Sequence, residues 1–357
     1  MKILLRIFVA MLLLYSVPAF SEEKSQESIN EINDQFMRSY TGGRYPEAVE
    51  LAKRALTVTE EMLGPSHVSV ASALDNVALA YTAQGKYSEA EPFFVRALAI
   101  RERALGPDHP DVIKAVENLS AVYRAEGRYA EAEPLFKRVL AAKEKALGPN
   151  HAEVMTSLEN LAALYTIEGK NSEAEPLLKS MVGRKERVLG PDHPDVVAAV
   201  NTLARVYYSE GKYKEAESLY SRVLKARERT HGQDHLNVVA AMNNLASVYY
   251  AEHRYPEAEQ LYRRVLTIRE KALGPDHPDV AAAMNKLARV YYCEEKYTDA
   301  EPLYRRALDI LEKNFGPDDA GVAVVLEGMS ELCRKIGKDD EARKLADRAR
   351  TIRAKKQ

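Results

Sequence analysis

The sequence repeats itself every 42 residues, and this period constrains the fold more than any other feature. A glycine recurs at that step, at Gly64, Gly106, Gly148, Gly190, Gly232, Gly274 and Gly316. An alanine recurs in the same register without exception, at Ala48, Ala90, Ala132, Ala174, Ala216, Ala258, Ala300 and Ala342. Such a period is typical of an array in which each unit packs only on its neighbours, so chain length does not predict the number of domains.

Each unit begins with an amphipathic helix. In the third unit Val112, Val116, Leu119 and Tyr123 follow one another at steps of four, three and four, which places them on one helical stripe. Gly127 then ends the helix. The sequence therefore predicts a first helix, which we name helix A, over residues 111–126.

The residues before helix A favour a defined start. His109 can cap the helix, and Pro110 suits the first helical position because its missing N–H would be unpaired there anyway. The carboxylate of Asp111 faces the positive end of the helix dipole. The same segment recurs at Gly190 and Gly274, so we expect the start to be shared.

A second helix, helix B, completes each unit. In the third unit it starts around Tyr129 and ends at Gly148, with an apolar stripe of Ala132, Leu135, Phe136, Val139 and Leu140. Eight such helix pairs fit between about Glu27 and Gln357. The sequence therefore predicts an all-α fold.

Small and aromatic residues of helix A predict how the helices pack. Small residues should face the recurring alanine of helix B and allow close approach of the two backbones, at Ala78, Ser120, Ala162, Ala204, Ala246 and Ala288. Tyrosines should fill the gap between consecutive units, at Tyr81, Tyr123, Tyr165, Tyr207, Tyr249 and Tyr291.

Composition excludes several classes of partner. Apolar residues make up 46% of the chain, which is enough for a core. The formal net charge is only −2, and basic and acidic residues are interspersed. The sequence therefore indicates neither nucleic acid nor an anionic membrane as the ligand.

The first residues differ from all that follow. Residues 1–6 contain Lys2 and Arg6, residues 7–15 are apolar, and residues 16–21 are mainly small or turn-forming, a pattern typical of a secretory signal peptide. We predict cleavage after residue 21 and export to the periplasm or out of the cell. An uncleaved anchor is the alternative, but the apolar run is shorter than the roughly 20 residues a bilayer needs, so we expect no stable span after cleavage.

Cysteine is rare for a chain predicted to leave the cytoplasm. Only Cys293 and Cys333 are present, so disulfides cannot be its main source of stability. The two can pair only if neighbouring helices bring their Cα atoms within about 7 Å. Two buried or partly buried free thiols are the other interpretation.

The sequence predicts no catalytic or metal site. Six histidines recur, at His67, His109, His151, His193, His235 and His277. Zinc needs ligand nitrogens about 2 Å away, whereas packed helices lie roughly 8 to 10 Å apart, so capping is the better interpretation. No HExxH, CxxC, Gly-x-Ser-x-Gly or Walker motif is present. We expect no enzymatic activity, no cofactor and no metal.

The motifs within each unit resemble the tetratricopeptide repeat (TPR). A small residue is followed three residues later by Tyr, and then by Gly85-Lys86-Tyr87 in one unit and Glu131-Ala132-Glu133-Pro134-Leu135 in the next. The 42-residue period with Gly106-Pro107-Asp108-His109-Pro110-Asp111 resembles the kinesin-light-chain variety. The heptad coiled coil of the light chain is absent, so a motor role is not inferred.

The resemblance implies a right-handed superhelical TPR solenoid of about eight antiparallel helix pairs, whose A helices line a concave groove that binds peptides. We expect a signal peptide over residues 1–21 and an N-terminal capping pair over residues 22–63. Six 42-residue units should occupy residues 64–315, and a C-terminal capping pair residues 316–357.

The family's groove positions map onto residues whose chemistry changes along the chain. At the first of them the early units present Asp75, Glu117 and Glu159, and the later units present Asn201, Asn243 and Asn285. Neighbouring groove positions in the later units hold Asn244, Lys286, Arg205, Arg289, Tyr208, Tyr250 and Tyr292. These residues of the later units form the candidate peptide-binding site.

Two interpretations of this site are open. The asparagines can pair with an extended peptide backbone, the cations can bind an acidic side chain or a free C-terminal carboxylate, and the tyrosines can supply aromatic contacts. Alternatively, the asparagines bridge adjacent helices and the tyrosines only line the packing. The chain is accordingly interpreted as a protein–protein interaction scaffold, with a structural subunit of a cell-envelope or secretion assembly as the alternative.

Overall fold

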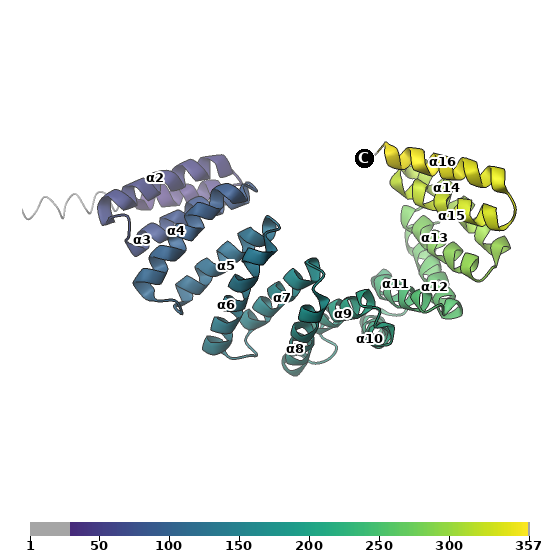
Figure 1. The fold of residues 1–357 in the computed structure, drawn as a ribbon, viewed down its shortest axis with the longest axis horizontal. Coiled ribbons are helices and arrows are strands. Elements are labelled where there is room, and N and C mark those ends of the chain that lie inside the picture. Colours follow the sequence, from purple (N-terminus) through teal and green to yellow (C-terminus); the bar gives the residue numbers. More distant parts are fainter. Residues whose placement is uncertain (1–28, 356–357) are drawn as a thin grey trace, which may run out of the picture. The chain divides into compact units, whose positions relative to one another are not determined.

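The computed structural model describes residues 29–355, and these residues are almost entirely helical (Figure 1). Residues 29–41 form the first helix. None of the described residues forms a β-strand. The helices that follow are α2 (Tyr45–Leu63), α3 (Val68–Ala83), α4 (Tyr87–Leu105), α5 (Pro110–Ala125), α6 (Tyr129–Leu147), α7 (Ala152–Ile167), α8 (Asn171–Leu189), α9 (Pro194–Ser209), α10 (Tyr213–His231), α11 (Leu236–Ala251), α12 (Tyr255–Leu273), α13 (Pro278–Cys293), α14 (Tyr297–Phe315), α15 (Ala320–Lys335) and α16 (Asp339–Ala354). The predicted all-α array of about eight antiparallel helix pairs is confirmed.

Histidine caps start the A helices, which are the odd-numbered helices from α3 onward. The Nδ1 atom of His109 accepts a hydrogen bond from the Asp111 N–H at 3.2 Å. The other five repeat histidines do the same at 3.1 to 3.3 Å. Asp319 takes this role in α15, where its carboxylate accepts from the Gly321 N–H at 2.7 Å. The predicted capping role of these histidines is confirmed, because each satisfies an N–H that the helix leaves unpaired.

The recurring glycine ends most of the B helices. Gly106 has a φ of 85° and its N–H donates to the Glu102 carbonyl at 3.0 Å. A residue with a side chain rarely adopts a positive φ of this size, which explains why glycine occupies this position.

Small residues let the two helices of a pair approach closely. The recurring alanines of the B helices are fully buried, and their partners on the A helices are at most 2% exposed. In the last pair the contact is direct, because the Ser330 hydroxyl donates to the Ala342 carbonyl at 2.8 Å. A larger side chain would force the backbones apart.

Tyrosines and ion pairs connect consecutive pairs. The Tyr123 hydroxyl donates to Glu91 of the preceding B helix at 3.0 Å, and Arg128 binds the same carboxylate at 2.5 Å. Tyr165 and Lys170 repeat this arrangement on Glu133, both at 3.0 Å. The tyrosines therefore fill the gap between units as predicted.

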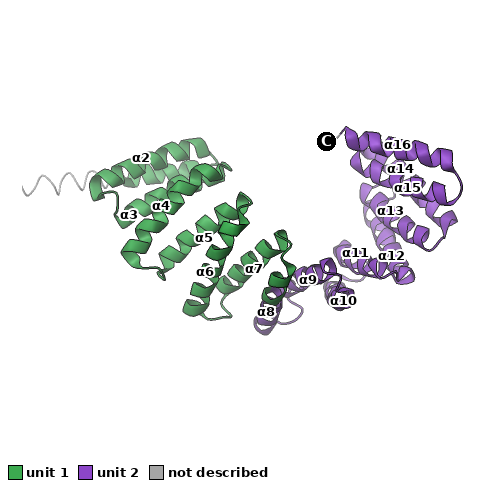
Figure 2. Cartoon of the chain, viewed as in Figure 1, with its two compact units in different colours: residues 1–177 green, residues 178–357 purple. Residues whose placement is uncertain are grey.

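The chain divides into two compact units (Figure 2). The N-terminal unit extends to Leu177 and the C-terminal unit begins at Leu178, so the division falls inside α8. The predicted signal peptide, residues 1–21, lies outside the described residues. Within residues 29–355, no helix is both long and apolar enough to cross a membrane.

Two helical glycines should respond oppositely to alanine. A Cβ atom on Gly328 would lie 2.7 Å from the Tyr304 ring, whereas a Cβ atom on Gly183 would meet nothing within 4 Å. We expect Gly183→Ala to stabilise the fold by about 0.5–1 kcal/mol, because alanine has the better helix propensity. Gly328→Ala should instead destabilise it by about 1–3 kcal/mol through overpacking. Urea unfolding followed by circular dichroism measures both, and a stabilised Gly328→Ala variant would contradict the packing described.

Candidate functional site

The candidate residues lie on three consecutive A helices of the C-terminal unit. Helix α9 carries Asn201, Arg205 and Tyr208, α11 carries Asn243, Asn244 and Tyr250, and α13 carries Asn285, Lys286, Arg289 and Tyr292. The three cations are exposed and the other side chains are half-buried. We name these ten residues the candidate face.

Hydrogen bonds between neighbouring helices join the asparagines into a row. The Asn244 carboxamide donates to the Asn201 oxygen at 3.1 Å, and Lys286 donates to the Asn243 oxygen at 3.1 Å. The Asn243 nitrogen donates to the Val239 carbonyl at 3.0 Å. Bridging between helices, which the sequence left open, is therefore present. These bonds use both the oxygen and the nitrogen of the Asn243 carboxamide. The nitrogen of Asn201 and the oxygen of Asn244 have no hydrogen-bond partner within residues 29–355, so they are available to a ligand.

The row stops at Asn285. The two bonds above join residues 43 positions apart, and the residue 43 positions after Asn285 is Gly328, which has no side chain. The Asn285 side-chain oxygen is buried without a hydrogen-bond partner in the described structure. Leaving a buried acceptor unpaired typically costs about 1–3 kcal/mol, so this oxygen lowers the stability of the C-terminal unit.

The three cations of the face make no ion pair within residues 29–355. Lys286 is bonded only to the neutral Asn243, and partial desolvation lowers its pKa, with the charge of Arg269 as a second cause. The Arg289 guanidinium lies 5.9 Å from the centre of the Tyr250 ring. The face therefore carries positive charge with no carboxylate at ion-pair distance among the described residues, and Glu331 acts on Arg289 from farther away.

Each tyrosine of the face packs against the tyrosine that begins the next B helix. The ring centres are 5.7 Å apart for Tyr208 and Tyr213, 5.7 Å for Tyr250 and Tyr255, and 5.9 Å for Tyr292 and Tyr297. Part of each ring thus serves packing, and the remainder is available as a rigid aromatic surface.

The two cysteines are free thiols. The Cys293 Sγ atom lies 3.3 Å from the Tyr250 hydroxyl. Burial, with Cys293 as the second cause, raises the pKa of Tyr250 to about 12, so this phenol stays neutral. Cys333 is buried, and burial raises the pKa of its thiol.

Ion pairs inside the N-terminal pairs reveal two further recurring positions. Asp75 of α3 pairs with Arg101 of α4 at 2.6 Å, and both side chains are largely buried. Glu117 of α5 pairs with Lys143 of α6 at 2.5 Å, 26 residues later. We name the residue on helix A the acid position and the residue on helix B the base position.

The C-terminal unit keeps two bases but loses their acids. Asn201 and Asn243 occupy the acid position, while Arg227 and Arg269 occupy the base position. The two arginines donate instead to backbone carbonyls of the next A helix, at 3.0 Å and 2.7 Å. The nearest carboxylate to Arg269 is that of Asp279, at 3.9 Å. Arg269 adds to the positive charge beside Lys286.

The acid returns in the last pair. Glu327 of α15 binds Arg353 of α16 through two hydrogen bonds of 2.6 and 2.7 Å. Within the described C-terminal unit, the missing carboxylates are thus confined to α9, α11 and α13. The change from acid to asparagine is evident in the sequence. Arg227 and Arg269 were not predicted, and the 26-residue spacing is the signal that identifies them.

The described residues contain no group of three or more His, Cys, Asp or Glu side chains that could hold a metal ion. His231 and His235 stack with ring centres 5.4 Å apart, and His235 Nδ1 is occupied by its cap. His235 is thus accounted for by a helix start, whereas His231 is the last residue of α10.

One family model matches along most of the chain. The family model described as tetratricopeptide repeat matches seven overlapping stretches, residues 40–103, 69–145, 111–182, 153–229, 196–271, 237–313 and 291–355. No curated protein matches the chain.

Several solved structures are similar to the chain. Nearly identical TPR-like repeats assigned to a kinesin light chain of Podosopora anserina are 29% identical, with a TM-score of 0.51, and cover 58% of this chain and 98% of that one. BtubC (BKLC) from P. vanneervenii is 24% identical, with a TM-score of 0.50, over 68% of this chain and 89% of that one. A tetratricopeptide repeat protein from Parabacteroides merdae is 17% identical, with a TM-score of 0.52, over 79% and 93%.

The Asp75–Arg101 pair predicts unequal effects of removing either partner. Arg101→Met should destabilise the fold by about 3 kcal/mol, because it leaves a largely buried carboxylate uncompensated. Asp75→Asn should cost less than this, because a neutral carboxamide of the same shape still accepts from Arg101 although the cation loses its counter-charge. Urea unfolding at neutral pH tests this order, and equal losses would contradict it.

The same pair also predicts a dependence on pH. Desolvation raises the pKa of Asp75 above its usual 3.8, with Arg101 opposing the shift. The folded chain therefore binds this proton more tightly than the unfolded chain. As pH falls through the raised value toward 3.8, wild type should gain stability relative to Asp75→Asn. A stability difference that is flat across that window would show that the shift is absent.

Proposed function

Because this chain belongs to the tetratricopeptide-repeat family, we propose that it is an interaction scaffold whose C-terminal unit binds an acidic segment of a peptide or partner protein. TPR proteins are generally protein–protein interaction scaffolds and typically have no enzymatic activity. The proposal adds the location of the contact, which is the candidate face, and the charge of the ligand.

The loss of carboxylates at the acid position is the observation that carries this proposal. In the N-terminal unit each base of the series is neutralised by its own repeat, as in Asp75–Arg101 and Glu117–Lys143. On α9 to α13 asparagine replaces the acid, and Arg227 and Arg269 remain. Positive groups that lack a carboxylate in their own helix pair favour an anionic ligand, because the ligand supplies the missing charge.

The remaining groups of the candidate face suit a peptide that carries those charges. The free nitrogen of Asn201 and the free oxygen of Asn244 provide one donor and one acceptor for a main chain. The exposed guanidinium groups of Arg205 and Arg289 can bind carboxylates in a bidentate manner. Both acidic side chains and a free C-terminal carboxylate offer this chemistry.

We further propose that the scaffold works in the periplasm or outside the cell. The support is the sequence of residues 1–21, with its basic start, apolar centre and small residues near the end. Mass spectrometry of the protein from its own cells should give a chain that lacks these residues. An intact leader on the purified protein would contradict cleavage.

Fluorescence anisotropy with a labelled peptide of alternating Glu and Ser tests the ligand charge. We expect this peptide to bind the full chain, and its affinity to fall with salt, because the contact is electrostatic. The matching peptide of alternating Gln and Ser should bind at least about tenfold more weakly. Comparing free-acid and amidated versions distinguishes a C-terminal carboxylate from acidic side chains. Equal affinity for the Glu and Gln peptides would reject the proposal.

Restoring the missing acids is the sharpest variant. Asn201→Asp with Asn243→Asp should neutralise Arg227 and Arg269 and weaken binding of the Glu peptide by about tenfold. Asn118→Asp with Asn160→Asp makes the same net-charge change in the N-terminal unit and should leave affinity unaltered. Asn243→Ala with Arg289→Ala should also weaken binding by about tenfold while the helical circular dichroism is unchanged. Unaltered affinity in both C-terminal variants would exclude the candidate face.

A further inference from the structure

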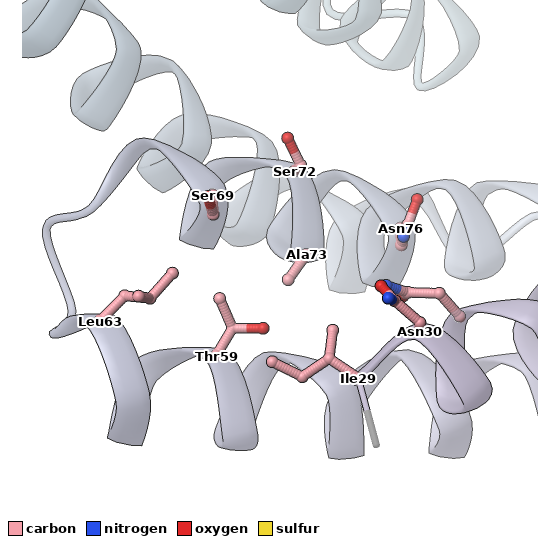
Figure 3. Close-up of a pocket in the computed structure, with 9 residues that line it drawn as sticks. Ile29, Asn30, Thr59, Leu63, Ser69, Ser72, Ala73 and Asn76 are labelled. Carbon is pink, nitrogen blue, oxygen red and sulfur yellow. The ribbon is translucent and has the colours of Figure 1, made fainter. Parts of the chain in front are cut away.

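A polar pocket opens in the first helix pair of the N-terminal unit (Figure 3). It has a volume of about 220 Å³ and lies between the helix of residues 29–41, α2 and α3. Thr59 and Ile29 line one side, and Ser69, Ala73 and Asn76 face them from α3 (Figure 3). No charged side chain belongs to its lining.

An equivalent pocket of about 210 Å³ recurs two repeats later, between α5, α6 and α7. There the acid and base positions hold Glu117 and Lys143, and Lys143 also binds Glu153 at 3.1 Å. The charged side chains at the acid and base positions of that pocket therefore pair with each other, and neither is left without a partner.

The first pocket replaces each of these charges by a neutral group. Asn33 stands at the acid position, Thr59 at the base position, and Ser69 where the later pocket has Glu153. Thr59 is only 5% exposed, and its hydroxyl already donates to the Ala55 carbonyl at 2.7 Å. The pocket thus recurs at the same place in the repeat, but in the first repeat these three positions carry no charge.

The unpaired polar groups of this pocket are carboxamides. Asn33 and Asn76 are half-buried, and within residues 29–355 neither side chain forms a hydrogen bond. Asn30, from the helix of residues 29–41, adds a third carboxamide at the same end of the pocket as Asn76 (Figure 3). Each carboxamide offers donors and an acceptor, so together they match a group that has both.

We propose that this pocket binds an uncharged amide group of a partner, either a Gln or Asn side chain or a main-chain amide. A charged group would lose hydration without meeting an opposite charge, which is costly. An apolar group would leave the carboxamides of Asn33 and Asn76 unsatisfied. The apolar side chains Ile29 and Ala73 contact the carbon atoms of the ligand, and the carboxamides bind its amide.

This site is separate from the candidate face. It lies entirely in the N-terminal unit and takes an uncharged group, whereas the proposed function concerns anions on α9 to α13. The two therefore succeed or fail independently.

Nuclear magnetic resonance titration of the labelled full chain tests the proposal with matched small probes. N-acetyl-glutamine-N-methylamide should shift the side-chain amide signals of Asn33 and Asn76 in a saturable manner. The glutamate counterpart has the same shape and a charge. If the side-chain amide occupies the pocket, this probe should shift the signals at least about tenfold less at equal concentration, and the alanine counterpart should shift them as little. Equal responses to all three probes assign binding to their shared main-chain amides. Equal responses to the glutamine and glutamate probes with none to the alanine probe, or no saturable response to any probe, would overturn the proposal.

Two variants locate the effect. Asn33→Asp with Thr59→Arg installs the ion pair that Asp75 and Arg101 form in the next repeat and should abolish the response of Asn76. Asn76→Ser removes one carboxamide with little change in packing, and it should weaken the response of Asn33 by about tenfold. Asn118→Ser, at the equivalent position of the next A helix, should leave both responses unaltered. Undiminished binding in a folded Asn76→Ser variant would show that the pocket is not the site.

Discussion

Close contact between the two helices of each pair is the constraint on which the rest of the structure depends. The recurring alanines of the B helices have no exposed surface, and in the last pair Ser330 reaches the Ala342 carbonyl directly. This contact fixes the distance between helix A and helix B. Residues 26 positions apart then meet in three pairs, as Asp75 with Arg101, Glu117 with Lys143, and Glu327 with Arg353. The acid and base positions, and both pockets of the N-terminal unit, follow from that distance.

The fold was largely predictable from the sequence because its determinants are local. Helical stripes, histidine caps and terminal glycines each act within a few residues, and the structure confirms them, as it does the tyrosines between units. The site was less predictable. The repeat placed Asn243 on the correct helix, but it did not reveal that both ends of its carboxamide are occupied. Which partner a side chain selects depends on competition among neighbours in space, and a repeat pattern does not contain that information.

Electrostatic neutralisation, more than shape, distinguishes the repeats from one another. From α3 to α14 the helix lengths repeat from pair to pair, yet α3 and α5 carry carboxylates at the acid position, whereas α9, α11 and α13 carry asparagine. Because the base persists in α10 and α12, substitution of the acid by asparagine leaves Arg227 and Arg269 without a carboxylate in their own pair. The first repeat loses both charges and is left with carboxamides. One structural position therefore has three chemistries along the chain.

Each acid and base position belongs to one 42-residue unit, whereas the arginines of α10 and α12 also bind the first turn of the following unit. Gain or loss of a whole unit by recombination would preserve every contact inside a pair and create one new junction. Such events would reorder the charged, neutral and unpaired positions without an intermediate that fails to fold. Lineages with this architecture are accordingly expected to change ligand preference by copy number and unit order as readily as by point substitution.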